Sequence, residues 1–135
     1  MFKIAVLDDD QQWGLAIQRF FRNEFEVSIY VDAYSFLLQA HEYDLAIVDF
    51  SIPPARFEKN MNGCELICQL KHDLLQPPVL ILATGFLSQN DLGAGKALCP
   101  EADGFLVKDI GLAAILQQIK QFLAAKGSTN EQSTR

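Results

Sequence analysis

The chain has 135 residues, 50% of them hydrophobic and 21% charged, which is typical of one folded domain with a sizeable core. No apolar run is long enough to span a bilayer, and residues 1–10 reach acidic side chains too early for a signal peptide, so we expect a cytoplasmic protein. The net charge of −6 argues against a nucleic-acid-binding surface, which requires clustered basic residues.

The first third of the chain predicts two strands and two helices. Residues 3–7 form a short aliphatic strand that ends in a run of acids, residues 8–10. Apolar side chains then recur at helical spacing over residues 11–25. Residues 25–31 alternate as a half-buried strand does, and residues 33–42 predict a second helix.

The middle of the chain repeats this alternation. Residues 44–48 form a fully apolar strand, and a loop with two consecutive prolines follows over residues 50–62. Residues 63–72 carry apolar side chains on one helical face, and residues 78–83 form a further apolar strand.

The last third predicts a weak helix, a short strand and a strong helix. The helix expected over residues 88–98 is weakened by two internal glycines. Residues 105–107 form the final strand, and residues 111–125 form a helix with regular apolar periodicity. The polar residues 126–135 are expected to be a disordered tail that follows a domain of residues 1–125.

The order of these elements predicts an α/β fold. Five strand–helix units with continuous apolar strands indicate a doubly wound, five-stranded parallel sheet with helices on both faces. Ligands bind to such sheets beyond the carboxyl ends of the strands. Those ends carry five polar or charged residues: Asp8, Asp9, Asp49, Thr84 and Lys108.

These five side chains suit the transfer of a phosphoryl group to a carboxylate. Three converging carboxylates repel one another, and Mg²⁺ relieves that repulsion while leaving a coordination position for a phosphate oxygen. The hydroxyl of Thr84 and the ammonium of Lys108 supply a donor and a positive charge for the other phosphoryl oxygens. A carboxylate can itself be the nucleophile, so the set predicts aspartyl phosphorylation.

Five segments occur in an order that resembles a two-component response regulator receiver domain: KIAVLDDD, DLAIVDFSIP, MNGCELICQLK, PVLILATG and GFLVK. The resemblance implies a flavodoxin-like sheet with strand order 2-1-3-4-5. It assigns the following roles: phosphoacceptor, Asp49; Mg²⁺ ligands, Asp8, Asp9, Asp49 and the backbone carbonyl of Ser51; phosphoryl contacts, Thr84 and Lys108; switch residues, Thr84 and Phe105.

The resemblance also implies partners. The phosphoryl donor would be a phosphohistidine of a sensor histidine kinase or of a histidine phosphotransfer protein. The chain would catalyse only its own phosphorylation and dephosphorylation, and it would signal through protein contacts, since no helix-turn-helix follows residue 125. The output protein is not identified by the sequence, and homodimerisation on activation stays open.

The sequence departs from the family pattern around the site. Asp109 stands where a cis-proline is common, which predicts a trans Lys108–Asp109 bond, a changed direction of Lys108 and competition by Asp109 for its ammonium. The loop between Pro53 and Gly63 is longer than usual. The three cysteines, Cys64, Cys68 and Cys99, lack zinc-ligand spacing and are predicted to be small buried hydrophobes in a reducing compartment.

Two other functions remain open from the sequence. A phosphohydrolase of the haloacid dehalogenase type would use Asp8, Thr84 and Lys108, but it would leave Asp49 without a role. A receiver-like interaction module that works without phosphorylation is the other alternative, because Asp109 and the long loop alter the border of the site.

Overall fold

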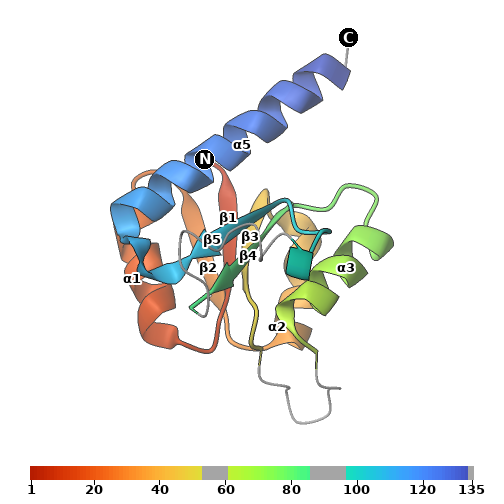
Figure 1. Cartoon of the computed structure of the whole chain (residues 1–135). Coiled ribbons are helices and arrows are strands. Elements are labelled where there is room, and N and C mark those ends of the chain that lie inside the picture. Colours follow the sequence, from red (N-terminus) through yellow and green to blue (C-terminus); the bar gives the residue numbers. More distant parts are fainter. Residues whose placement is uncertain (53–60, 86–96, 134–135) are drawn as a thin grey trace.

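The computed structural model describes residues 1–52, 61–85 and 97–133 (Figure 1). A five-stranded parallel sheet has the order β2-β1-β3-β4-β5. The strands are β1 (Lys3–Leu7), β2 (Glu26–Tyr30), β3 (Leu45–Asp49), β4 (Val79–Thr84) and β5 (Gly104–Val107). The predicted α/β class and strand order are confirmed.

Helices cover both faces of the sheet. They are α1 (Gln11–Phe21), α2 (Ala33–Gln39), α3 (Gly63–Asp73) and α5 (Leu112–Ser133), with two short 3₁₀ helices, η1 (Ala40–Glu42) and η3 (Lys108–Ile110). Figure 1 shows α1 and α5 on one side of the sheet, and α2 and α3 on the other. Each pair of helices encloses its own core cluster against the sheet.

Burial explains why the central strands are apolar throughout. Every residue of β3 and β4 is buried, and in β1 only the first residue is partly exposed. Successive side chains of a strand point to opposite faces, so Ile47 joins the core beneath α1 and α5 while Val48 joins the core beneath α2 and α3. A strand covered on both sides therefore needs apolar residues at every position.

Side-chain caps fix where the helices start. Asp10 accepts a hydrogen bond from the backbone N–H of Trp13, at 3.2 Å, and thereby caps α1. Asn62 and Glu65 form a reciprocal capping box at the start of α3, with distances of 2.8 and 3.1 Å. Helix α3 begins immediately beside the end of β3, because the backbone N–H of Gly63 donates to the carbonyl of Phe50.

Several predicted limits differ from the observed ones. Helix α1 ends at Phe21 rather than near residue 25, because the chain must turn before Glu26 pairs with Lys3. Helix α5 continues to Ser133 and projects past the sheet (Figure 1), where a disordered tail was expected. Residues 126–133 contain no proline to stop the helix. The weak helix predicted over 88–98 falls largely outside the described residues.

Cys99 is fully buried, as predicted, but two of the three cysteines are bonded to each other rather than being separate buried hydrophobes. Cys64, in the first turn of α3, forms a disulfide with Cys99, and their Cα atoms lie 5.6 Å apart. Cys68 is a free thiol. The two bonded residues are 35 positions apart, so only the packing of α3 against the segment before β5 brings them together.

Among the described residues, no helix has the length and apolar character needed to cross a bilayer.

Candidate functional site

Three carboxylates meet at the carboxyl ends of β1 and β3. These strands are neighbours and run parallel, with Leu7 opposite Val48, so the residues that follow them lie side by side. Ligand oxygens of Asp8, Asp9 and Asp49 all lie within 4.8 Å of one another. Asp8 is 2% exposed and Asp49 8% exposed, whereas Asp9 is exposed to solvent. The cluster predicted from the strand ends is therefore present.

Lys108 joins two of these carboxylates. Its Nζ lies 2.5 Å from Oδ2 of Asp8 and 2.9 Å from Oδ1 of Asp49. The other oxygen of Asp8, Oδ1, accepts the backbone N–H of Asp10 at 2.9 Å. The ammonium of Lys108 also lies 5.0 Å from the centre of the Trp13 ring, a distance that permits a cation–π interaction. One lysine thus faces two buried acids and an aromatic ring.

The balance of charge perturbs both partners. Burial raises the pKa of the Asp49 carboxyl above its ordinary value; the hydrogen bond from Lys108 opposes this shift and the charge of Asp8 adds to it. Burial alone would lower the pKa of Lys108, but its hydrogen bonds to Asp8 and Asp49 outweigh burial, and the net shift is upward. The raised pKa of Lys108 favours its protonated form, and the raised pKa of Asp49 makes its ionisation less favourable than that of an exposed aspartate.

Thr84 stands at the same edge of the sheet. It is the last residue of β4, 6% exposed, and Asp49 pairs with Ala83, so Thr84 follows the residue opposite the acid. Ser51 lines an open hollow of about 520 Å³ together with Asp9, on the outer side of the site. The structure places these residues where the sequence predicted them, and their roles toward a phosphoryl group stay predictions.

Phe105 lies on β5 opposite Leu82. Its ring is partly buried and packs against the core cluster beneath α2 and α3. Phe105 therefore lies on the edge strand, two strands away from the β3 strand that carries Asp49. The proposed switching role of this aromatic residue is not tested by one structure, and it stays a prediction.

Asp109 does not displace Lys108. The Lys108–Asp109 bond is trans, since no cis peptide bond occurs among the described residues, as the sequence predicted. The expected competition is absent, however: within 4 Å of the ammonium, the carboxylates in the described part of the chain are those of Asp8 and Asp49. Asp109 is exposed to solvent within η3.

Gly63 lets α3 approach the acceptor strand. A Cβ atom built at this position would collide with the backbone carbonyl of Asp49 and would also touch Leu82. The amide of Gly63 donates to the carbonyl of Phe50 at 2.8 Å, directly after Asp49. The first turn of α3 therefore supports the backbone on which the buried acid is carried.

The sequence profile of the response regulator receiver domain matches residues 4–120. The chain belongs to this family. Receiver domains of response regulators generally bind Mg²⁺ at an acidic cluster, and Asp8, Asp9 and Asp49 form such a cluster here. Receiver domains of response regulators also interact with histidine kinases and output domains. Membership in this family disfavours the phosphohydrolase alternative.

Solved structures share the receiver fold at low sequence identity. A CheY-like receiver domain protein from Methanospirillum hungatei is 23% identical, with a TM-score of 0.76 and coverage of 96% of this chain and 98% of the other. The receiver domain of a putative LuxO repressor protein from Vibrio parahaemolyticus is 15% identical, with a TM-score of 0.78 and coverages of 96% and 95%. NtrX from Brucella abortus is 20% identical, with a TM-score of 0.80, covering 98% of this chain and 29% of NtrX. No curated protein matches the chain significantly.

Two features of the site were missed by the sequence reasoning. The ring of Trp13 faces the Lys108 ammonium, a contact that the apolar periodicity of residues 11–25 does not indicate. Its place in the first turn of the helix that follows the acids is a signal that could have suggested this contact. The Cys64–Cys99 bond has no signal in the spacing of the cysteines, because it depends on tertiary packing.

Proposed function

We propose that this receiver domain accepts a phosphoryl group on Asp49 from a phosphohistidine of a sensor histidine kinase or a histidine phosphotransfer protein. The observation that carries the proposal is the buried Asp49 carboxylate held 2.9 Å from Lys108 inside a cluster of three acids. A carboxylate oxygen of Asp49 would bond to phosphorus while the phosphorus–nitrogen bond of the donor breaks. The electron pair returns to the imidazole, which takes up a proton.

The acidic cluster suits Mg²⁺. Asp8, Asp9 and Asp49 offer carboxylate oxygens within 4.8 Å of one another, and the backbone carbonyl of Ser51 is the proposed further ligand. A bound Mg²⁺ would supply positive charge to the phosphoryl oxygens and offset the repulsion between the acids. Such oxygen-only ligand sets fit a hard cation better than a soft transition metal.

The other strand-end residues would stabilise the product. Lys108 would exchange its bond to Asp49 for one to a phosphoryl oxygen while keeping its bond to Asp8. Thr84 would donate its hydroxyl to another phosphoryl oxygen. The chain would transfer the group only to and from itself, rather than turn over a separate substrate. We place this exchange in the cytoplasm, with signalling through protein contacts and without direct binding of nucleic acid.

Acetyl phosphate tests the proposal without a known kinase. The full chain is incubated with acetyl phosphate, with or without Mg²⁺, and its intact mass is measured. We expect the mass of one added phosphoryl group, lost on chelation of Mg²⁺ and in Asp49→Asn. Asp103→Asn serves as a matched control, because this carboxylate is ion-paired with Lys71 away from the site. No gain in mass with any donor would favour the phosphorylation-independent module.

A turnover assay tests the phosphohydrolase alternative directly. Multiple turnovers of p-nitrophenyl phosphate that Asp8→Ala abolishes and Asp49→Ala leaves intact would contradict the phosphoacceptor assignment. We expect no sustained turnover.

A further inference from the structure

Two cysteines are held at bonding distance by the fold. Cys64 and Cys99 have Cα atoms 5.6 Å apart, within the range of about 4.4–6.8 Å found for disulfides. The side chain of Cys99 is fully buried in the core cluster beneath α2 and α3, and Cys64 is partly exposed. The bond between them can therefore form and break without large movement of the backbone, and Cys64 is the sulfur that solvent reaches.

Cys64 belongs to the wall beside the acceptor. It follows Gly63, whose backbone packs directly on the carbonyl of Asp49. Its neighbours Asn62 and Glu65 form the capping box and also line the hollow that contains Asp9. The first turn of α3 therefore forms one wall of the acidic site, and a change in its mobility would alter that wall.

Cys99 belongs to the segment that leads into β5. Its carbonyl accepts the backbone N–H of Ala102 at 3.2 Å, and Asp103 next along the chain exchanges two hydrogen bonds with Leu80 of β4. The disulfide thus joins the first turn of α3 to a segment that is hydrogen-bonded to β4 just before β5 begins.

The other end of α3 has a separate attachment. Lys71, in the last turn, forms an ion pair with Asp103 at 2.6 Å. This contact does not depend on the oxidation state of any cysteine. Breaking the disulfide would consequently remove one constraint from the end of α3 that lies near Asp49 and leave the ion pair at the opposite end unchanged.

We propose that Cys64 and Cys99 are a reversible oxidation site that sets how firmly the first turn of α3 is held beside Asp49. A peroxide would oxidise the two thiols to the disulfide and be reduced to water, with two electrons and two protons passing to it. Thiols of a reducing cytoplasm would reverse the reaction by thiol–disulfide exchange. The consequence for phosphorylation rests on the proposed function.

Cys68 provides a matched control. It lies one turn further along α3, is partly exposed and is a free thiol. The full chain is treated with hydrogen peroxide or with dithiothreitol and then unfolded in denaturant, so that the buried Cys99 is also reached. The remaining thiols are alkylated there, and the alkylated sites are mapped by mass spectrometry. We expect protection of Cys64 and Cys99 in the oxidised wild type and in Cys68→Ser, and no protection in Cys64→Ser. A disulfide through Cys68, or none at all, would overturn the proposal.

Amide hydrogen exchange measures the proposed consequence. We expect oxidation to slow exchange in the first turn of α3 by about threefold or more, with little change in the last turn. Cys64→Ser should show no response to peroxide. Equal exchange in the oxidised and reduced wild type would contradict the proposal, because the bond would then hold nothing that the fold does not already hold.

Phosphorylation is measured separately, with acetyl phosphate as the donor. We expect the oxidised wild type to react at no more than about half the rate of the reduced wild type. The disulfide would hold the first turn of α3 more firmly, so this turn would yield less to a group added at Asp49. Equal rates in the two forms would contradict the link between the cysteines and Asp49. If neither form gains a phosphoryl group, the proposed function fails, while alkylation and hydrogen exchange still decide the oxidation site.

Discussion

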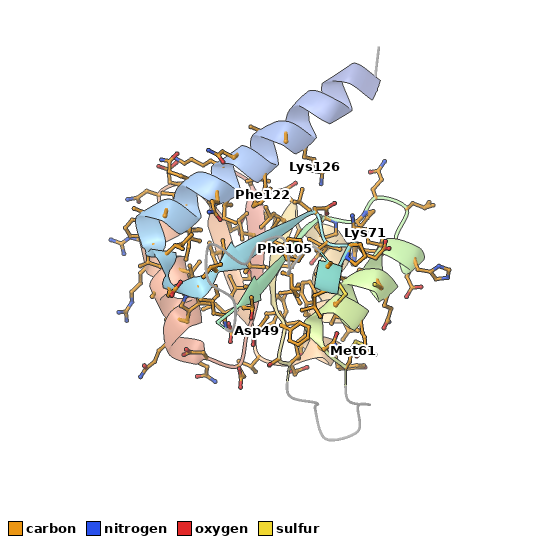
Figure 2. All side chains as sticks on the ribbon, viewed as in Figure 1. Asp49, Met61, Lys71, Phe105, Phe122 and Lys126 are labelled. Carbon is orange, nitrogen blue, oxygen red and sulfur yellow. A yellow bond between two sulfur atoms is a disulfide. The ribbon has the colours of Figure 1, made fainter. Side chains whose placement is uncertain are left out.

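Lysine–carboxylate contacts occur at both ends of the parallel sheet, and they differ in burial and in charge balance. At the carboxyl ends of the strands, Lys108 is 20% exposed and faces Asp8 and Asp49, which are 1% and 9% exposed as side chains. At the amino ends, Lys71 and Asp103 are 29% and 36% exposed and pair one to one. Figure 2 shows Asp49 and Lys71 near these opposite ends.

The two ion pairs differ in whether their charges balance. The Lys71–Asp103 pair is neutral overall and near solvent, so it needs no further ligand and contributes little to stability. The Lys108 cluster holds two buried carboxylates against one ammonium, an excess of negative charge that costs stability until a cation binds. Five predictions test this contrast, and they run from the largest expected effect to the smallest.

Removing the cationic head of Lys108 should have the largest effect. We expect Lys108→Met to slow phosphorylation of Asp49 by about 100-fold, because the phosphoryl oxygens lose a preorganised positive charge. Lys71→Met, the same change at the opposite end, should leave the rate within about twofold of the wild type. Intact-mass kinetics with acetyl phosphate and Mg²⁺ measure both. Equal slowing in the two variants would remove the distinction between the two ends.

Adding a methyl group at Gly63 should come next. Gly63→Ala drives a Cβ into the carbonyl of Asp49, so we expect a loss of about 2 kcal/mol in the free energy of unfolding and slower phosphorylation. Gly104→Ala meets the ring of Phe122 instead, at the other end of the sheet. That control should lose stability while phosphorylation of the folded protein stays normal. Urea denaturation and mass kinetics separate the two effects.

Neutralising Asp49 should stabilise the metal-free protein. Because burial raises the pKa of Asp49, the native state binds its proton more tightly than the unfolded state does, and ionisation costs stability. We expect Asp49→Asn to gain about 1 kcal/mol in EDTA at neutral pH. The gain should fall to zero as the pH drops through the interval between the raised pKa and the ordinary value of 3.8.

With Mg²⁺ bound, the wild type should become more stable than Asp49→Asn. Thermal unfolding followed with and without Mg²⁺ should show a larger increase in Tm for the wild type than for Asp49→Asn, since the variant has lost one carboxylate of the cluster. A wild type that is already more stable than the variant in EDTA would show that Lys108 balances the acids fully, without a metal.

The exposed pair should give the smallest effect. We expect Lys71→Met to reduce the free energy of unfolding by about 0.5 kcal/mol, and the difference should shrink in high salt because exposed charges are screened. Urea denaturation at low and high salt measures it. A loss of several kcal/mol that salt does not affect would mean that this end of α3 depends on the pair far more than its exposure suggests.

The sequence alone determined most of the fold and the core of the site. Parallel strands bring their carboxyl ends to one edge, so the apolar runs that end at Asp8, Asp49, Thr84 and Lys108 were enough to predict which residues meet. Periodicity predicted the long helices of the described residues to within a few residues, apart from the far end of α5.

Only the tertiary structure decided the contacts between elements that the strand order does not fix. Three such contacts depend on how helices and loops pack against the sheet. They are the ring of Trp13 beside Lys108, the lack of space for a Cβ atom at Gly63, and the Cys64–Cys99 bond. Such packing sets side-chain distances to within about an ångström, and a linear pattern of apolar residues carries no information at that scale.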